Sequence, residues 1–222
     1  MRAIETAAPA GTLTEALRER TKALHTTAER TGIVNDILKR KADRQAYATF
    51  LFNMLPAYGE LESALDRRRN QPLFYAFART ELYRTDSLSA VLAVLSGANW
   101  RRELVMQPAA EQYSARIAEV ADGDAGRLIA HAYVRYFGDL SGGQILKGLL
   151  GKTLNLPPQA LSFYDFPGIA DHTAFKNAMR HAINVELAAV CDPEAVIDEA
   201  KCAFEHNIAI SKAVQETLLL KI

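Results

Sequence analysis

The sequence predicts a single all-α domain, a multi-helical bundle, and three observations support this fold class. The chain has 222 residues, which suits one domain or two small ones. Apolar residues recur at three- and four-residue steps almost throughout, as they do on the buried face of a helix. Alternating patterns typical of strands are nearly absent. With 49% apolar residues the chain can bury a core without disulfides. We therefore expect one domain over residues 12–222, preceded by a loose tail over residues 1–11.

The first two helices follow from a capping signal and a long apolar stripe. Thr12 and Glu15 have the spacing of a capping box, which predicts a helix start at this point. A second helix follows, and Asn70-Gln71-Pro72 closes it. Pro56 lies inside this segment and should kink the helix or break it near residue 52, because proline lacks the backbone N–H. The stripe consists of Tyr47, Phe50, Leu51, Met54, Tyr58, Leu61 and Leu65.

The second half of the chain predicts the remaining helices, about seven or eight in all. A short helix is expected over residues 87–95, irregular structure over 96–108, and a long helix over about 125–150. Residues 155–168 contain three prolines and should be mostly loop. A helix over 173–190 follows. Asp192-Pro193 then predicts the start of the last helix, since Pro suits the first helical position. Its inner face should contain Val196, Ala200, Phe204 and Ile208.

The charge balance and the cysteine count exclude several classes of protein. Lys plus Arg number 26 and Asp plus Glu number 26, so the formal net charge is zero. A bulk electrostatic attraction to nucleic acid or to an anionic membrane is therefore not expected. The sequence contains no run of about 18 apolar residues, so it predicts no membrane-spanning helix. The first residues do not resemble a secretory signal. Two cysteines are too few for a disulfide framework and suit a reducing compartment.

One segment, residues 131–144, does not fit an ordinary structural helix. It contains Gly138, Gly142 and Gly143, and each glycine should cost about 1 kcal/mol relative to alanine inside a helix. Gly138 and Gly142 are four residues apart and share a face, so a flat ligand can approach the backbone there. Close packing of two helices is an equally good explanation from composition alone.

Polar residues at helical spacing form three further candidate groups. Arg135 and Asp139 are four apart beside the glycines; a surface ion pair is the usual explanation for such spacing. On the first helix, the four residues Arg18, Lys22, His25 and Glu29 share one face. A lone histidine is more often structural than a ligand, yet this one has cations and a carboxylate beside it, and a neutral imidazole can bind iron. Lys176 and Arg180 are also four residues apart. This spacing fits either a solvated charged face or a clamp for two carboxylates of a ligand.

Two of these segments resemble the haem oxygenase family. Residues 133–147, YVRYFGDLSGGQILK, are similar to the distal-helix signature of the family, and residues 21–29, TKALHTTAE, to its proximal helix. The resemblance extends from about Leu13 to Leu218. It implies a bundle in which haem lies between a proximal helix and a glycine-kinked distal helix, and an enzyme that cleaves haem b oxidatively to biliverdin, carbon monoxide and ferrous iron.

The resemblance also implies roles for individual residues. His25 matches the proximal iron ligand, and Glu29 matches the carboxylate beside it. Asp139 matches the acid that holds the distal water network. Arg135, Tyr58 and Asn207 match the polar partners of this acid. Gly138, Gly142 and Gly143 match the backbone that closes over the haem. Contacts to the propionates match Arg18, Lys22, Tyr133, Lys176 and Arg180, and an aromatic residue of the pocket wall matches Phe204.

The sequence departs from the family in ways that bear on partners and location. Arg18 stands where many relatives have lysine, so that a bidentate fork replaces a point charge. The apolar membrane tail of animal members and a Cys-Pro haem-regulatory motif are absent from the sequence. The resemblance thus implies a monomer of the cytoplasm or a compartment like the plastid stroma. Its implied co-substrate is O₂, and its electrons are expected from an external donor, either ferredoxin or a reductase, with no nucleic-acid or membrane partner.

Three other functions compete with this one. A haem carrier or sensor needs His25 and the cations but has no need for Asp139. A di-iron enzyme of the same fold commonly needs Glu-x-x-His pairs, and none of the five histidines has a glutamate three residues before it. A purely structural helical protein does not explain the glycine cluster. Addition of hemin, then of reductant and air, separates these alternatives by absorption.

Overall fold

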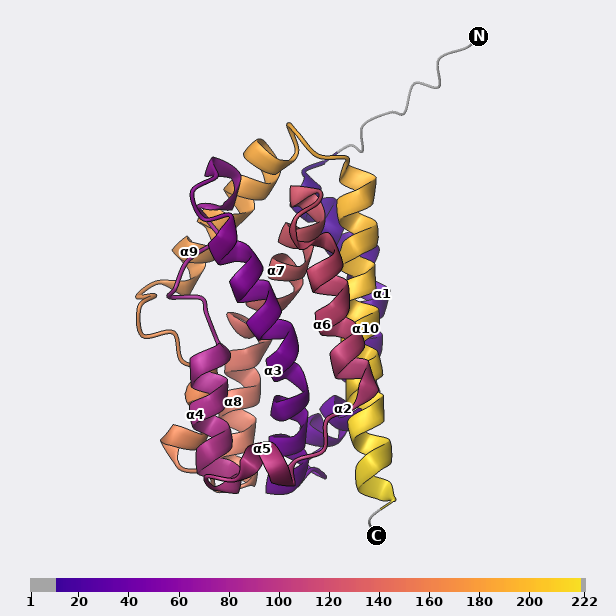
Figure 1. The fold of residues 1–222 in the computed structure, drawn as a ribbon, viewed down its shortest axis with the longest axis vertical. Helices are drawn as coiled ribbons and strands as arrows, with labels where there is room; N and C mark the ends of the chain where they lie inside the picture. The colour runs from indigo at the N-terminus through magenta and orange to yellow at the C-terminus, as the bar shows by residue number, and fades with distance from the viewer. Residues whose placement is uncertain (1–10, 221–222) are drawn as a thin grey trace.

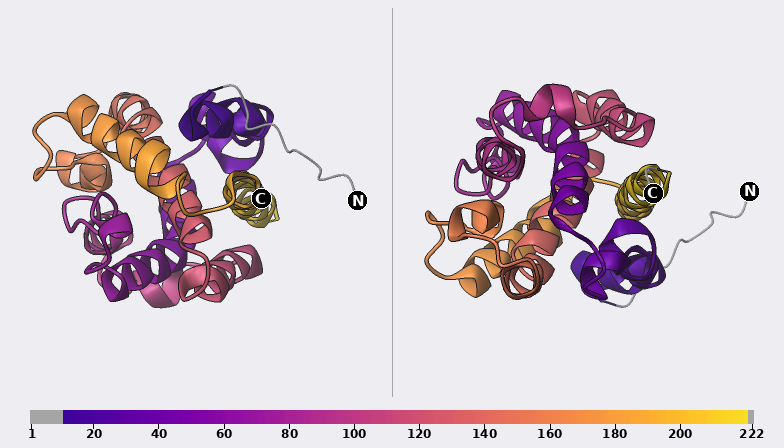
Figure 2. Two further views of the ribbon diagram at one scale, coloured as in Figure 1. Left: turned by 90° about the horizontal axis from the view of Figure 1, so that it is seen from above. Right: turned by 90° about the horizontal axis from the view of Figure 1, so that it is seen from below.

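In the computed structural model, which describes residues 11–220, the chain is an all-helical bundle (Figure 1). The long helices lie roughly along the long axis of the molecule, and α10 is seen end-on beside α1 in the view from above (Figure 2). The predicted fold class is therefore confirmed. The α-helices of the described part are α1 (Leu13–Arg30), α2 (Gly32–Leu38), α3 (Arg44–Arg67), α4 (Thr85–Ser96), α5 (Trp100–Glu103), α6 (Pro108–Ala121), α7 (Ala125–Asp139), α8 (Gly142–Thr153), α9 (His172–His181) and α10 (Pro193–Leu219).

Three short segments of other helical types complete the described chain. Two are 3₁₀ helices, η1 (Pro72–Phe74) and η2 (Pro158–Tyr164). The third, η3 (Ala182–Leu187), is a π-helix that continues directly from α9. The expected tail, residues 1–11, lies outside the described residues except for Gly11. Between residues 11 and 220, no helix combines the length and the apolarity needed to span a bilayer.

Both predicted helix caps are present. At α1, the Thr12 hydroxyl accepts the Glu15 amide, and the Glu15 carboxylate accepts the Thr12 amide at 2.8 Å. At α10, the Asp192 side chain accepts the Glu194 amide at 3.1 Å, and Pro193 occupies the first helical position. These caps satisfy amides that have no partner within the helix, so local sequence sets the start of both helices.

The break expected near residue 52 does not occur. α3 runs without interruption from Arg44 to Arg67 and contains Pro56. Both faces of this helix pack against others, and side chains such as Tyr47, Leu61 and Leu65 are fully buried. Packing of so many apolar residues outweighs the cost of about 3 kcal/mol that an internal proline carries.

The long helix expected over 125–150 is two helices. α7 ends at Asp139 and α8 begins at Gly142, and Ser141 between them has φ −124° and ψ −81°, which are not helical angles. The glycines on either side remove the side chains that would otherwise fill the inner corner. The chain therefore changes direction beside Asp139, where the candidate distal residues lie.

A tight corner joins α1 to α2 and fixes the end of α1 against α10. Gly32 has φ +62°, and a Cβ placed on it would lie 2.4 Å from the backbone carbon of Ser211 on α10. The Ser211 hydroxyl donates to the Thr31 carbonyl at 3.1 Å and accepts the Val34 amide at 3.1 Å. Only glycine fits at this corner.

Candidate functional site

A cavity of about 580 Å³ lies between α1 and the α7–α8 pair, and α3 and α10 contribute to its wall. It gathers nearly all the residues singled out from the sequence, although these are spread over four segments of the chain. Those that line it are Arg18, Lys22, His25, Glu29, Tyr58, Tyr133, Arg135, Gly138, Asp139, Gly142, Gly143, Phe204 and Asn207.

His25 presents its imidazole to the cavity from α1. The side chain is 59% exposed, and its Nδ1 lies 3.7 Å from a carboxylate oxygen of Glu29, one turn further along the helix. The ring of Phe204 packs edge-on against it with centroids 5.8 Å apart. Within residues 11–220 the imidazole makes no polar contact closer than the one to Glu29. Its Nε2 is therefore free to coordinate the metal of a bound ligand.

The glycines on the opposite wall differ from one another. A Cβ placed on Gly138 or Gly142 meets nothing within 4 Å, whereas one on Gly143 lies 3.1 Å from the Tyr164 ring. Gly138 and Gly142 thus leave open space over the backbone, and Gly143 makes room for an aromatic neighbour. Open space at two backbone positions suits a flat ligand, and it argues against helix packing as the reason for those two glycines.

Asp139 is buried at the end of α7 and accepts a hydrogen bond of 2.6 Å from the Tyr58 hydroxyl of α3. Burial raises the pKa of the Asp139 carboxyl, and the opposing effects of Arg135, Tyr58 and Arg84 do not cancel that rise. Burial also raises the pKa of Tyr58 well above its ordinary value, so this phenol stays a donor. The pair can therefore hold and release a proton inside the cavity.

Arg135 and Asn207 line the same wall with unpaired polar atoms. Arg135 forms no ion pair with Asp139 or with any other described residue; its guanidinium lies 5.7 Å from the Tyr58 ring centroid and donates to the Met54 sulfur at 3.9 Å. The surface ion pair considered from the spacing is therefore wrong. Arg135 Nε and Asn207 Oδ1 are buried without a hydrogen-bond partner. Such atoms normally bind water or a ligand.

The cations predicted to form a carboxylate clamp separate into two sets. Arg18 and Lys22 line the cavity, but Lys176 and Arg180 do not. Lys176 donates to the Ser141 hydroxyl at 2.9 Å, and Arg180 lies 5.3 Å from the Phe137 ring centroid and donates to Asn177 at 2.7 Å. Ser141 and Phe137 themselves line the cavity. Lys176 and Arg180 of α9 thus contact residues of the cavity wall but do not line the cavity themselves.

Tyr133 marks the end of the cavity where the two sets meet. Burial raises the pKa of its phenol, and Arg180 and Arg18 both oppose that rise, so both cations act on the same ring. This end of the cavity is therefore positive. The apolar part of the wall was missed from the sequence. Every core helix carries apolar residues, so periodicity does not distinguish those that line a cavity from those that fill the core. The apolar residues of the wall are Val34, Leu38, Phe50, Leu51, Ile145, Leu146 and Phe163.

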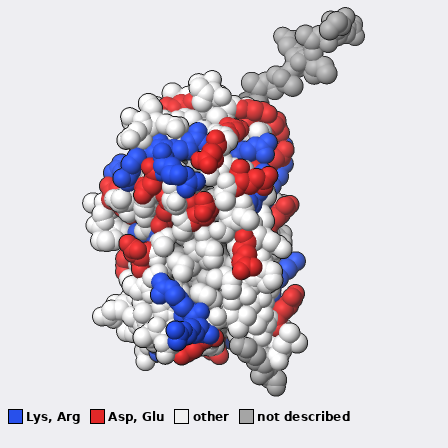
Figure 3. Space-filling view, viewed as in Figure 1, with Lys and Arg blue, Asp and Glu red and all other residues white. Residues whose placement is uncertain are grey.

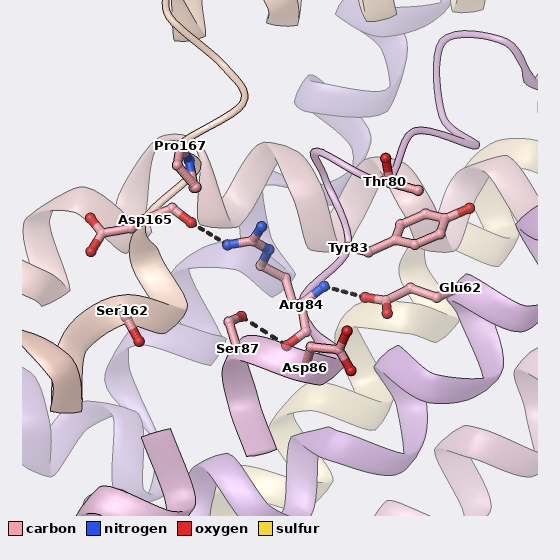
Figure 4. A pocket seen from close by; sticks show the side chains of 9 residues that line it. All are labelled: Glu62, Thr80, Tyr83, Arg84, Asp86, Ser87, Ser162, Asp165 and Pro167. Atoms are coloured by element: carbon pink, nitrogen blue, oxygen red, sulfur yellow. Dashed lines mark hydrogen bonds between the residues drawn. The ribbon is translucent and has the colours of Figure 1, made fainter. Parts of the chain in front are cut away.

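A second cavity of about 460 Å³ lies beside the start of α4 and is built around Arg84 (Figure 4). The guanidinium donates only to backbone carbonyls, those of Leu82, Phe163, Asp165 and Glu81. The buried Glu62 carboxylate accepts the Arg84 and Thr85 amides at the N-terminus of α4. These groups are already satisfied, so we assign this cavity a structural role.

A buried polar cluster behind the main cavity was also missed from the sequence. His131 is fully buried, and its Nε2 lies 3.0 Å from Glu199 on α10, which also accepts Arg116 of α6 at 2.6 Å. Burial raises the pKa of Glu199, but His131 and Arg116 outweigh that effect and lower the pKa to about 2. One signal was available: Glu199 is a carboxylate beside Ala200 on the predicted inner face of the last helix.

Charged side chains of both signs intermingle on the face of the molecule shown in Figure 3. On this face, lysines and arginines at the upper end lie beside glutamates and aspartates, and no large patch of one sign forms. The mixture of signs on this face agrees with the zero formal net charge of the chain.

The chain matches the family model described as "Heme oxygenase" over residues 11–213. It is 36% identical to human "Heme oxygenase 1" over 209 residues, which are 93% of this chain and 73% of the relative. It is 35% identical to "Heme oxygenase 1" of the cyanobacterium Synechocystis over 210 residues, 95% of this chain and 88% of the relative. The crystal structure of the Synechocystis heme oxygenase-1 in complex with heme superposes with a TM-score of 0.85 at 34% identity, covering 95% of this chain and 96% of that chain.

Proposed function

This chain belongs to the haem oxygenase family, and we propose that the cavity between α1 and the α7–α8 pair is where it binds and cleaves haem. The enzyme converts haem to biliverdin, carbon monoxide and ferrous iron, using O₂ and electrons from a reductant. One observation carries the assignment of the site. A free imidazole on one wall faces a buried acid and two bare glycine backbones on the other.

The residues of the cavity fit haem. The space left by Gly138 and Gly142 suits a flat ring, and the apolar wall suits its hydrocarbon edge. Buried Arg135 Nε and Asn207 Oδ1 lack partners until water or ligand is present. Arg18 and Lys22 at the positive end match two carboxylates in charge. The bound group supplies the iron centre at which O₂ reacts and the ring carbon that is oxidised.

On the α1 side, we assign His25 as the ligand of the haem iron. Glu29 lies near Nδ1, which favours the tautomer that carries its proton on Nδ1 and leaves Nε2 as the ligand atom. Phe204 packs against the imidazole edge and limits rotation of the ring. With haem bound, His25 would supply an imidazole ligand, which donates less electron density to the iron than a thiolate would.

On the opposite side, Asp139 acts as the residue that delivers protons. Burial raises the pKa of its carboxyl, which favours the protonated acid, and Tyr58 holds the carboxyl in place by a hydrogen bond. The unpaired atoms of Arg135 and Asn207 are placed to hold water between this acid and the centre of the cavity. Gly138 and Gly142 keep side chains out of that space, which would leave it open to water that carries the protons.

The cations orient the ring by its carboxylates. Arg18 and Lys22, which line the cavity, would hold them from α1. Lys176 and Arg180 would hold them from α9 after exchanging their present partners Ser141 and Asn177. The electron donor is an external protein, either ferredoxin or a reductase. The enzyme acts as a monomer in the cytoplasm or in a compartment like the plastid stroma.

A haem carrier that does not turn over is the alternative, and the Asp139–Tyr58 pair disfavours it, since storage of haem needs no buried acid. The test is an absorption titration of the purified chain with hemin, followed by reductant in air. We expect one tight hemin equivalent, then loss of the haem spectrum and formation of biliverdin and carbon monoxide. Stable oxygenated or oxidised haem without biliverdin would establish the carrier instead.

A further inference from the structure

The start of α1 is joined to the segment after α9 by one side chain. Asn184 lies in the π-helical segment η3, and its Oδ1 accepts the backbone amide of Thr14 at 2.9 Å, across 170 residues of sequence. The two views of Figure 2 show α1 near the end of α9. The bond is partly buried, so solvent competes with it less than at an open surface.

The amides of Thr12, Glu15 and Ala16 at this helix end are satisfied without α9. The capping box of Thr12 and Glu15 closes on itself, and the Ala16 amide bonds to the Thr12 carbonyl. Within residues 11–220, Asn184 is the one side chain from outside α1 and its cap that bonds to an amide here. Its contribution is therefore a link between two helices, added to a cap that is already formed.

Asn184 is itself held in place. Its neighbours Ala182 and Ile183 are buried, as is Leu187 one turn later, so η3 is fixed in the core while Asn184 reaches toward α1. A π-helical turn accommodates an extra residue, and such turns often occur at functional sites. Asn184 lies within this turn, and its side chain bonds to the start of α1.

The four clamp cations are arranged symmetrically about this bond. Counting from Thr14 along α1, Arg18 and Lys22 come four and eight residues later. Counting back from Asn184 along α9, Arg180 and Lys176 come four and eight residues earlier. Each cation thus lies about one or two helical turns from the Thr14–Asn184 bond. Burial raises the pKa of Tyr133, and the nearer cation of each helix, Arg180 or Arg18, opposes that rise.

From this geometry we propose that Asn184 is a positioning residue. It sets the spacing between the α1 cations and the α9 cations, and thereby the orientation of the haem carboxylates and the ring carbon that is oxidised. The proposal rests on the proposed haem site and its clamp. It assigns Asn184 no contact with haem, and it makes the choice of ring carbon depend on a residue outside the cavity wall.

The decisive comparison is between Asn184→Ala and Thr12→Ala. Both weaken the same end of α1, but only the first removes the link to α9. We expect Asn184→Ala to raise the share of minor biliverdin isomers several-fold, with a smaller change in hemin affinity. Thr12→Ala should keep the isomer ratio of the parent while lowering thermal stability. Asn184→Asp retains an acceptor oxygen, and it should restore the parent ratio.

Chromatography of the biliverdin isomers measures the ratio, and proton NMR of the hemin complex measures the ratio of haem orientations without turnover. An unchanged ratio in Asn184→Ala, or an equal change in Thr12→Ala, overturns the proposal. If the parent chain makes no biliverdin, the proposed function fails, yet NMR still tests the spacing. If Lys176→Glu/Arg180→Glu leaves the orientation unchanged, the clamp fails and the role of Asn184 fails with it.

Discussion

The hydroxyl of Tyr58 donates a hydrogen bond of 2.6 Å to Asp139, and this bond connects the middle of α3 to the last residue of α7. Asp139 lies directly before the change of direction between α7 and α8. The acid is therefore fixed by an uninterrupted helix on one side and by a helix end on the other. Asp139 forms no ion pair with Arg135, the partner that the spacing of the sequence suggests; the guanidinium lies near the Tyr58 ring instead.

Replacement of Asp139 by alanine should separate haem binding from haem cleavage. We expect hemin affinity close to that of the parent, because His25 and the apolar wall are unchanged. The rate of biliverdin formation should fall about 100-fold or more, as expected when a positioned proton donor is lost. Addition of hydrogen peroxide should then produce peroxidase-like oxidation of a dye. Asp139→Asn should keep part of the activity, and parent-level biliverdin formation in Asp139→Ala would falsify the assignment.

The raised pKa of Asp139 also predicts how the free energy of unfolding depends on pH. Burial raises the pKa of Asp139 in the folded state, so the folded protein binds the proton more tightly than the unfolded chain does. The ionised carboxyl therefore lowers stability at pH values above the folded pKa, and this cost disappears below the unfolded pKa near 4. We expect Asp139→Asn to be relatively more stable at pH 7 than at pH 3.5, as urea unfolding of the apoprotein measures. A pH-independent difference would contradict the raised pKa.

Substitution of His25 by alanine should remove turnover while hemin still binds through the cations and the apolar wall. The Soret spectrum should lose the features of a histidine ligand, and exogenous imidazole should restore part of both the spectrum and the activity. His172→Ala is a suitable control, because His172 packs against Phe166 and does not line the cavity. Normal haem degradation by His25→Ala would show that another residue binds the iron.

The distal glycines should respond differently to alanine. At Gly142 the new methyl group enters open space, so the apoprotein should gain up to about 1 kcal/mol, because alanine lowers the conformational entropy of the unfolded chain; hemin binding should weaken. At Gly143 the methyl group meets the Tyr164 ring, so stability should fall instead. Thermal unfolding of the apoproteins and hemin titrations measure both effects. Equal hemin affinity in Gly142→Ala and the parent would mean that the ligand does not approach this backbone.

Charge reversal at Lys176 and Arg180 should change haem orientation more than affinity. Both side chains lie behind the wall and partly in solvent, so their loss should cost no more than about tenfold in hemin affinity. The biliverdin isomer ratio should shift. Lys152→Glu/Lys212→Glu, two exposed lysines outside the cavity, provides the matched control. No change in either ratio or affinity would remove these cations from the clamp.

Glu199→Gln tests the cluster behind the cavity. His131 and Arg116 lower the pKa of Glu199 to about 2 against the effect of burial, so the ionised form stabilises the folded state. At neutral pH the substitution should cost about 3 kcal/mol. This difference should be constant above about pH 5 and shrink as the pH falls through about 2. Urea unfolding at several pH values measures it, and a stability difference that persists in acid would point to packing instead.

The residues that carry local signals were the ones that sequence analysis placed correctly. The capping box of Thr12 and the Asp192-Pro193 start depend on neighbours in the chain, and both are present. Pro56 was misjudged because long-range packing of α3 overrides the local cost of proline. The boundary between α7 and α8 was missed because glycine permits either a straight or a bent backbone, and only tertiary contacts select one.

The site shows the same division. Residues with chemically distinctive side chains, such as His25 and Asp139, were predicted together and do line one cavity. Lys176 and Arg180 were predicted beside them, yet their hydrogen bonds to Ser141 and Asn177 hold them behind the wall. A spacing of four residues fixes a shared helix face but not the partner of that face. For the same reason the position of Glu199 beside the inner face of the last helix signalled a buried carboxylate but not its partner, His131 on another helix.

The corner at Gly32 limits which sequences can carry this fold. With φ +62° and the Ser211 backbone 2.4 Å from any added Cβ, the position accepts no substitution unless α10 moves away from α1. Such a movement would also displace Phe204, which packs against His25. Mutational tolerance at position 32 should therefore be as low as at His25, the proposed iron ligand, even though Gly32 has no side chain and takes no part in the proposed chemistry. Directed evolution of this enzyme for a new porphyrin should leave this corner untouched and search the apolar wall.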